Sequence, residues 1–71
     1  MACVFYRKLG MRIKNLRKNK DLSREKLAEL ADMNTYYLGE IERGEKKASI
    51  DTLFKLCNVL DLKLHELVNI D

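Results

Sequence analysis

The sequence predicts an all-α fold, a compact domain of five short helices. Apolar residues recur at the spacing of one helical face along most of the chain, and no segment alternates strictly enough for a strand. The stretch from Leu22 to Lys47 divides into two short helices with about three residues between them, the length that a helix-turn-helix requires. At 71 residues the chain forms a single domain, residues 1–71, near the lower size limit for a core without disulfides or metal ions.

The first expected helix begins at about residue 7 or 12 and ends near Lys20. Its inward face carries apolar residues about one turn apart, Leu9, Ile13 and Leu16. Gly10 leaves the start of the helix open, because glycine is a poor helix former. Residues 1–10 are therefore either loose or an extension of this helix, and the core of the domain spans about 11–68.

The second and third helices are expected at 24–31 and 35–43. Ser23 caps the second helix, whose buried face carries Leu27, Ala28, Leu30 and Ala31. Asn34 caps the third, which turns Leu38 and Ile41 inward and stops at Gly44. Asp32 lies in the turn between them and tolerates a left-handed backbone better than most residues.

Two further helices complete the expected fold. The fourth starts after the N-cap Ser49, has Asp51 in its first turn, and turns inward an apolar stripe of Ile50, Leu53, Leu56, Cys57 and Leu60. The fifth covers about 63–68 and presents Leu64, Leu67 and Val68. Cys57 is interpreted as core filling and Cys3 as a free thiol near the terminus.

Several classes of function are not expected. The two cysteines are far apart and His65 is the single histidine, so ordinary zinc spacing is absent, as is a Ser/Cys–His–acid set. The start MACVFYRKLG lacks the features of a signal peptide, and no apolar run approaches the ~20 residues of a membrane span. We expect a cytoplasmic protein with no catalytic residues, metal, cofactor, membrane contact or small-molecule effector.

The net charge of +3 is unevenly distributed. Residues 1–20 contain seven basic and no acidic residues, whereas residues 21–71 contain seven basic and eleven acidic ones. A second basic cluster, Arg43, Lys46 and Lys47, follows the third expected helix. Lysine-rich faces are often only solvated surface, but basic groups on both flanks of an inserted helix suit the two phosphate walls of a DNA groove.

Four segments together resemble the Cro/phage-repressor (XRE-like) helix-turn-helix family: IKNLRKNKDLS at 13–23, KLAELA at 26–31, YLGEIERGEKKAS at 37–49 and TLFKLCNVLDLKLHEL at 52–67. Within the family, the run TYYLGEIERG is most similar to small controller-type regulators of restriction–modification systems. The resemblance implies a five-helix, lambda-repressor-like fold and a sequence-specific, DNA-binding transcriptional regulator. It also implies a buried structural ion pair between Arg17 and Glu42.

The third helix would enter the major groove. Opposite Leu38 and Ile41 lie the expected base-reading residues, Thr35, Tyr36, Tyr37, Gly39 and Glu40. Gly39 lets the helix approach the bases closely, while Tyr37 has the alternative of packing back on the domain. Glu40 either accepts from a cytosine amino group or repels phosphates. No long Arg, Gln or Asn lies at the centre of this face, so we expect specificity to depend largely on the shape and deformability of the DNA.

Five residues are expected to contact DNA phosphates: Arg24, Asn34, Arg43, Lys46 and Lys47. Arg24 stands where the family usually has a glutamine that reaches a phosphate, and its full charge preserves that role.

The C-terminal end is expected to form a two-fold dimer interface that lets the protein bind a pseudo-palindromic operator as a homodimer. Its apolar residues are Leu64, Leu67, Val68 and Ile70. The alternative is that Val68 and Ile70 fold back on the fourth helix. A different function on the same fold is a protein-interaction module, such as the antitoxin partner of a toxin, with DNA affinity weak or secondary.

Overall fold

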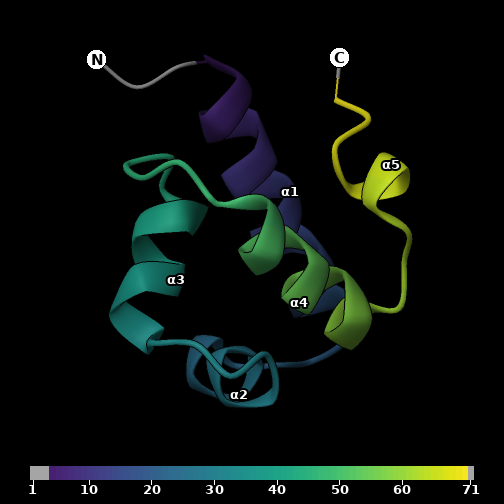
Figure 1. Cartoon of the computed structure of the whole chain (residues 1–71). Coiled ribbons are helices and arrows are strands. Elements are labelled where there is room, and N and C mark those ends of the chain that lie inside the picture. The colour runs from purple at the N-terminus through teal and green to yellow at the C-terminus, as the bar shows by residue number, and fades with distance from the viewer. Residues whose placement is uncertain (1–3, 71) are drawn as a thin grey trace.

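The computed structural model describes residues 4–70, and Cys3 lies outside this part of the chain. Helices and connecting turns make up the described part (Figure 1), which contains no strand. The helices are α1 (Val4–Asn19), α2 (Arg24–Leu30), α3 (Thr35–Glu42), α4 (Ile50–Leu60) and α5 (Leu64–Leu67). The predicted all-α fold and its helix-turn-helix are confirmed. Both ends of α2, α3 and α5 and the start of α4 lie within about one residue of their expected places.

The start of α1 differs from the prediction. The helix begins at Val4 instead of residue 7 or 12, so residues 4–10 extend it. Gly10 lies inside the helix at its closest approach to α3: a Cβ there would lie 2.6 Å from the Glu42 carbonyl oxygen and closer still to that of Ile41. This glycine therefore marks a helix crossing, because only a residue without a side chain lets the two backbones come so near.

Side-chain caps and left-handed turns separate the helices. The hydroxyl oxygens of Ser23 and Ser49 accept hydrogen bonds from backbone N–H groups of the first turns of α2 and α4, at 3.0 and 3.2 Å. Positive φ angles occur at the three aspartates that follow α1, α2 and α4, namely Asp21, Asp32 and Asp61, and at Gly44 after α3. Aspartate is among the few non-glycine residues that adopt this conformation at low cost.

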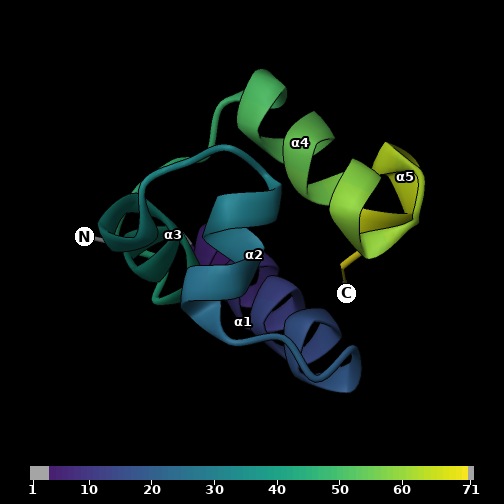
Figure 2. The same cartoon turned by 90° about the horizontal axis from the view of Figure 1, so that it is seen from below.

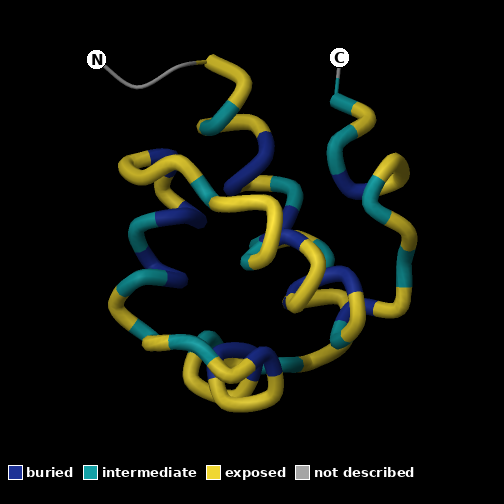
Figure 3. Tube along the Cα trace, in the orientation of Figure 1, coloured by how far each residue is buried: buried dark blue, intermediate teal, exposed yellow. Residues whose placement is uncertain are grey.

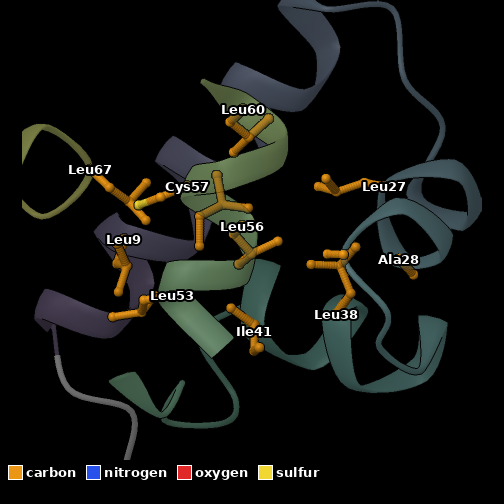
Figure 4. Close-up of a cluster of buried hydrophobic side chains, with 12 residues drawn as sticks. Leu9, Leu27, Ala28, Leu38, Ile41, Leu53, Leu56, Cys57, Leu60 and Leu67 are labelled. Carbon is orange, nitrogen blue, oxygen red and sulfur yellow. The ribbon is translucent and has the colours of Figure 1, made fainter. Parts of the chain in front are cut away.

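A single hydrophobic core lies where the helices meet (Figures 3 and 4). Its fully buried members come from every helix: Leu9, Ile13, Leu27, Leu38, Ile41, Leu56 and Leu67. Cys57 is also buried there, as predicted, and Leu16 packs against the core while half-buried.

Two predicted core residues are exposed. Leu30 and Ile50 are 50% and 57% exposed, so their assignment to the inner faces of α2 and α4 is wrong. In α2 the edge carrying Leu27, Ala28 and Ala31 faces the core, and Leu30 lies beside that edge. Ile50 is the first residue of α4, one turn before Leu53 and at the rim of the core.

The C-terminal helix is attached to α1 by an arginine. Nε and Nη2 of Arg12 donate to the backbone carbonyl oxygens of Leu67 and Glu66, at 3.1 and 2.9 Å. The side chain of Leu67 is fully buried in the core. In both views α5 lies on the opposite side of the molecule from α3 (Figures 1 and 2), so the C-terminal end does not obstruct the face that carries α3.

Candidate nucleic-acid interface

Helix α3 lies at the edge of the molecule with one side in the core and the other toward solvent (Figure 1). Its start is fixed by Asn34, whose Oδ1 accepts from the backbone N–H groups of Tyr36 and Tyr37 at 2.7 and 3.2 Å. Leu38 and Ile41 anchor the inner side. The cap and the two anchors together determine which side chains face outward.

The outward residues differ widely in exposure. Tyr36 is 82% exposed, the most open of the large apolar side chains in the described part of the chain. Thr35 and Glu40 are half-buried. Tyr37 is half-buried and packs against the core, the alternative left open by the sequence. Tyr36 is therefore the more accessible of the two adjacent tyrosines for contact with another molecule.

Gly39 lies at the bottom of a hollow of about 400 Å³, which we call the Gly39 hollow. Its lining residues are Arg24, Thr35, Tyr36, Gly39 and Arg43. A Cβ on Gly39 would lie 3.1 Å from Nη1 of Arg43 and 3.4 Å from Nη1 of Arg24. Gly39 is thus buried beneath two guanidinium groups that come from α2 and from the end of α3.

Each of these two arginines is held by a glutamate. Nε and Nη2 of Arg43 donate to the carboxylate of Glu45 at 2.9 and 3.1 Å. This hydrogen-bonded ion pair lowers the pKa of the Glu45 carboxyl below its ordinary value. Nε of Arg24 donates to Oε1 of Glu42 at 3.3 Å. Both arginines therefore approach the hollow with their charge partly balanced.

Glu42 is the centre of a buried ion-pair network. Arg17 donates through Nε and Nη2 to its two carboxylate oxygens at 2.7 and 3.2 Å, and the Glu42 side chain is 1% exposed. Nη1 of Arg17 also donates to the carbonyl oxygen of Leu22 at 2.8 Å. These are the two residues that the family resemblance pairs, and their contact ties α1 to the end of α3.

The two loop lysines lie beyond the end of α3 and are both exposed. Nζ of Lys47 lies 6.0 Å from the ring centroid of Tyr6, at the outer limit of a cation–π contact. The first turns of α1 therefore help to place the loop. The first turns of α1 also contact the loop at Gly44, where an added Cβ would lie 2.7 Å from the backbone of Arg7.

Two residues of this interface were not identified from the sequence: Glu45 holds Arg43, and Tyr6 lies beside Lys47. Away from the interface, the binding of Arg12 to the backbone of α5 was also not identified. Arg12 and Arg17 belong to the basic cluster of residues 1–20, yet both make internal hydrogen bonds. The positive charge of α1 is therefore less available to a partner than its composition indicates. Of these contacts, only the Arg43–Glu45 ion pair had a local signal in the sequence, because the two residues are two positions apart.

The four residues predicted to form a dimer interface have different environments. Leu67 is fully buried inside the protomer, so its assignment to the interface is wrong: a side chain that fills the core presents nothing to a second copy. Leu64, Val68 and Ile70 are half-buried. Ile70 lies beside α1, where it lines a hollow of about 420 Å³ with Met11 and Leu16 among other residues.

Within residues 4–70 no cluster of three or more His, Cys, Asp or Glu side chains is placed to hold a metal ion. Over the same residues, each helix is too short or too polar to cross a membrane.

The chain belongs to the helix-turn-helix family whose profile matches residues 13–67. It is similar to the HTH-type transcriptional regulator SinR of Bacillus licheniformis, with 44% identity over 62 residues that make up 86% of this chain and 56% of SinR. The chain thus spans about half the length of that curated relative.

Two solved structures show the same fold. The restriction-modification controller protein C.AhdI from Aeromonas hydrophila is 39% identical, with a TM-score of 0.85 over 87% of this chain and 94% of that one. SinR, described as the master regulator for biofilm formation and solved in complex with DNA, is 43% identical, with a TM-score of 0.81 over 84% of this chain and 97% of that one.

Proposed function

We propose that this protein is a sequence-specific, DNA-binding transcriptional regulator that inserts α3 into the major groove. The observation that carries the proposal is the geometry of α3. Its inner side is locked into the core, and its outer side presents Tyr36 and the Gly39 hollow at the edge of the molecule. A helix presented in this way fits the width of the major groove.

The surroundings of α3 support the proposal. Lys46 and Lys47 are exposed just beyond its end, where they reach phosphates beside the groove. The cap residue Asn34 supplies a further polar group at the start of α3, and Arg24, whose Nη1 lies beside Gly39, adds a guanidinium group to the hollow. The solved complex of SinR with DNA shows that a similar chain binds DNA. We also propose that the protein acts in the cytoplasm, where a DNA-binding regulator would meet its operator.

We propose that the protein binds as a homodimer on a pseudo-palindromic operator. The C-terminal end, with Leu64, Val68 and Ile70, lies across the molecule from α3. A two-fold contact through that end leaves the α3 of each protomer free to face DNA. The likeness to controller proteins suggests control of a promoter that the operator overlaps, including the protein's own.

The test is selection of binding sites from a pool of randomised duplexes, followed by measurement of the affinity for the enriched duplex and for random duplex over a salt series. We expect an enriched, two-fold symmetric sequence and a steep fall in affinity with salt, because phosphate contacts release counterions. No enrichment, with equally weak binding to all duplexes, would contradict the proposal and favour the protein-interaction alternative.

Two pairs of variants separate base reading from phosphate contact. Tyr36→Ala is expected to remove most of the preference for the enriched duplex, whereas Phe54→Ala, an exposed aromatic residue of α4, leaves it unchanged. Lys46→Ala is expected to weaken binding to every duplex and to reduce the salt slope by about one unit. Lys55→Ala, an exposed lysine of α4, is its control.

A further inference from the structure

The guanidinium group of Arg43 lies over the centre of the outer side of α3. The evidence is the 3.1 Å distance from its Nη1 to the position of a Cβ on Gly39. Thr35 and Tyr36 line the same hollow. When a helix enters the major groove, the centre of its outer side meets base edges, and its flanks meet phosphates.

The hydrogen bonds of Arg43 leave one edge of its guanidinium available. Nε and Nη2 form the side edge, and both donate to Glu45. Nη1 makes no hydrogen bond within the described residues, and Nη2 retains a second N–H. Nη1 and Nη2 together present two parallel donors on the end edge, the pattern that matches two adjacent acceptors.

The choice between a base and a phosphate follows from charge. Glu45 lies against Arg43 and balances its positive charge, so a nearby phosphate gains little attraction and meets a carboxylate. A guanine offers O6 and N7 as neutral acceptors in the major groove, spaced for the two donors of one arginine. Holding an arginine with a carboxylate reduces the freedom it loses on binding.

We propose that the Gly39 hollow is a guanine-reading subsite in which Nη1 and Nη2 of Arg43 donate to O6 and N7 of one guanine in each half-site. Glu45 is the positioning residue, and Gly39 provides the space for the guanidinium group. This inference rests on the proposed function, and it replaces the phosphate role that the sequence suggests for Arg43.

The test uses the full chain and the duplex selected by the wild-type protein. Each guanine of a half-site is replaced in turn by 7-deazaguanine, which removes the N7 acceptor and keeps Watson–Crick pairing. We expect one replacement to weaken wild-type binding by about tenfold. Arg43→Lys is expected to bind the duplexes with guanine and with 7-deazaguanine at that position equally well, because an ammonium group lacks the paired donors.

Two further variants test the positioning. Glu45→Gln is expected to reduce the ratio of specific to random binding while raising binding to random duplex, since it removes a negative charge. Gly39→Ala is expected to reduce the ratio between the affinities for the duplexes with guanine and with 7-deazaguanine at the same position. Circular dichroism and thermal unfolding check that each variant is folded, and Lys55→Ala is the control that leaves the discrimination intact.

The outcomes distinguish this inference from the proposed function. The inference is overturned if no guanine of the selected duplex is sensitive to the replacement, or if Arg43→Lys keeps the full sensitivity. It is also overturned if Arg43→Ala weakens all duplexes equally and lowers the salt slope by about one unit, the behaviour of a phosphate contact. If selection enriches no sequence at all, the proposed function itself has failed.

Discussion

Glu42 shows how one buried residue links the fold to the binding surface. Its carboxylate accepts from Arg17 inside the domain and from Arg24 at the edge of the Gly39 hollow. A buried carboxylate without a partner is strongly destabilising, whereas the same group with two arginine partners is tolerated. The residue therefore holds α1 to α3 and at the same time places an arginine beside the Gly39 hollow.

Replacing Arg17 by methionine is expected to lower the free energy of unfolding by about 3–5 kcal/mol, because Glu42 stays buried with only the weaker contact to Arg24. Arg24→Met is the matched control and should cost about 1 kcal/mol or less, since Arg17 still pairs with Glu42. Urea unfolding followed by circular dichroism measures both. Equal losses for the two variants would show that Arg17 does not dominate the pairing.

Burial raises the pKa of the Cys57 thiol above its ordinary value of 9.0, and the charge of Glu66 adds to the effect. The folded chain holds the thiol proton more tightly than the unfolded chain. This contribution to stability is therefore complete below the unfolded pKa and is lost as pH rises through the raised folded pKa. We expect the stability advantage of wild type over Cys57→Ala to shrink as pH rises above the ordinary thiol pKa of 9.0, as measured by urea unfolding.

At the scale of the helices, two glycines inside helices have opposite roles. Gly10 faces the backbone of α3, which cannot move without shifting the helix. Gly39 faces the ends of two arginine side chains, which can turn aside. Glycine therefore marks a close helix crossing in α1 and the Gly39 hollow in α3.

Alanine at these two positions is expected to change stability in opposite directions. Gly10→Ala forces α1 and α3 apart and should cost about 2 kcal/mol or more. Gly39→Ala gains helix propensity, up to about 1 kcal/mol, and displaces only flexible side chains, so the domain is unchanged or slightly more stable. Thermal unfolding of the two variants checks this. A Gly39→Ala protein that is less stable than wild type would contradict this expectation.

At the scale of the whole molecule, α3, the helix proposed to enter the groove, and the C-terminal end lie on opposite sides (Figures 1 and 2). A small domain that covers one half-site gains specificity when a second copy reads the other half. Because α3 and the C-terminal end are on opposite sides, two copies joined through their C-terminal ends can each read one half-site. The residues that remain candidates for the contact are Leu64, Val68 and Ile70, together with the exposed Met11, which lines the same hollow as Ile70.

Two C-terminal variants are expected to behave differently. Leu67→Ala empties a fully buried site and should lower the free energy of unfolding by about 2–5 kcal/mol. Ile70→Ser should leave each protomer folded and shift the protein from dimer to monomer in sedimentation velocity. A wild-type protein that sediments as a monomer at high micromolar concentration, with no dimer on the selected duplex, would exclude the proposed assembly.

The sequence by itself determined the helices, their caps and most of the core, because these depend on neighbours a few residues apart. Ser23, Asn34 and Ser49 cap the expected helices, and Leu38 and Ile41 face inward as their spacing predicts. The tertiary structure alone decided what depends on packing between helices. Gly10 is a crossing because α3 lies against it, and Leu67 is core because Arg12 holds α5 to α1. Arg24 and Arg43 come together over Gly39 because α2 packs against α3, an arrangement that residue spacing does not specify.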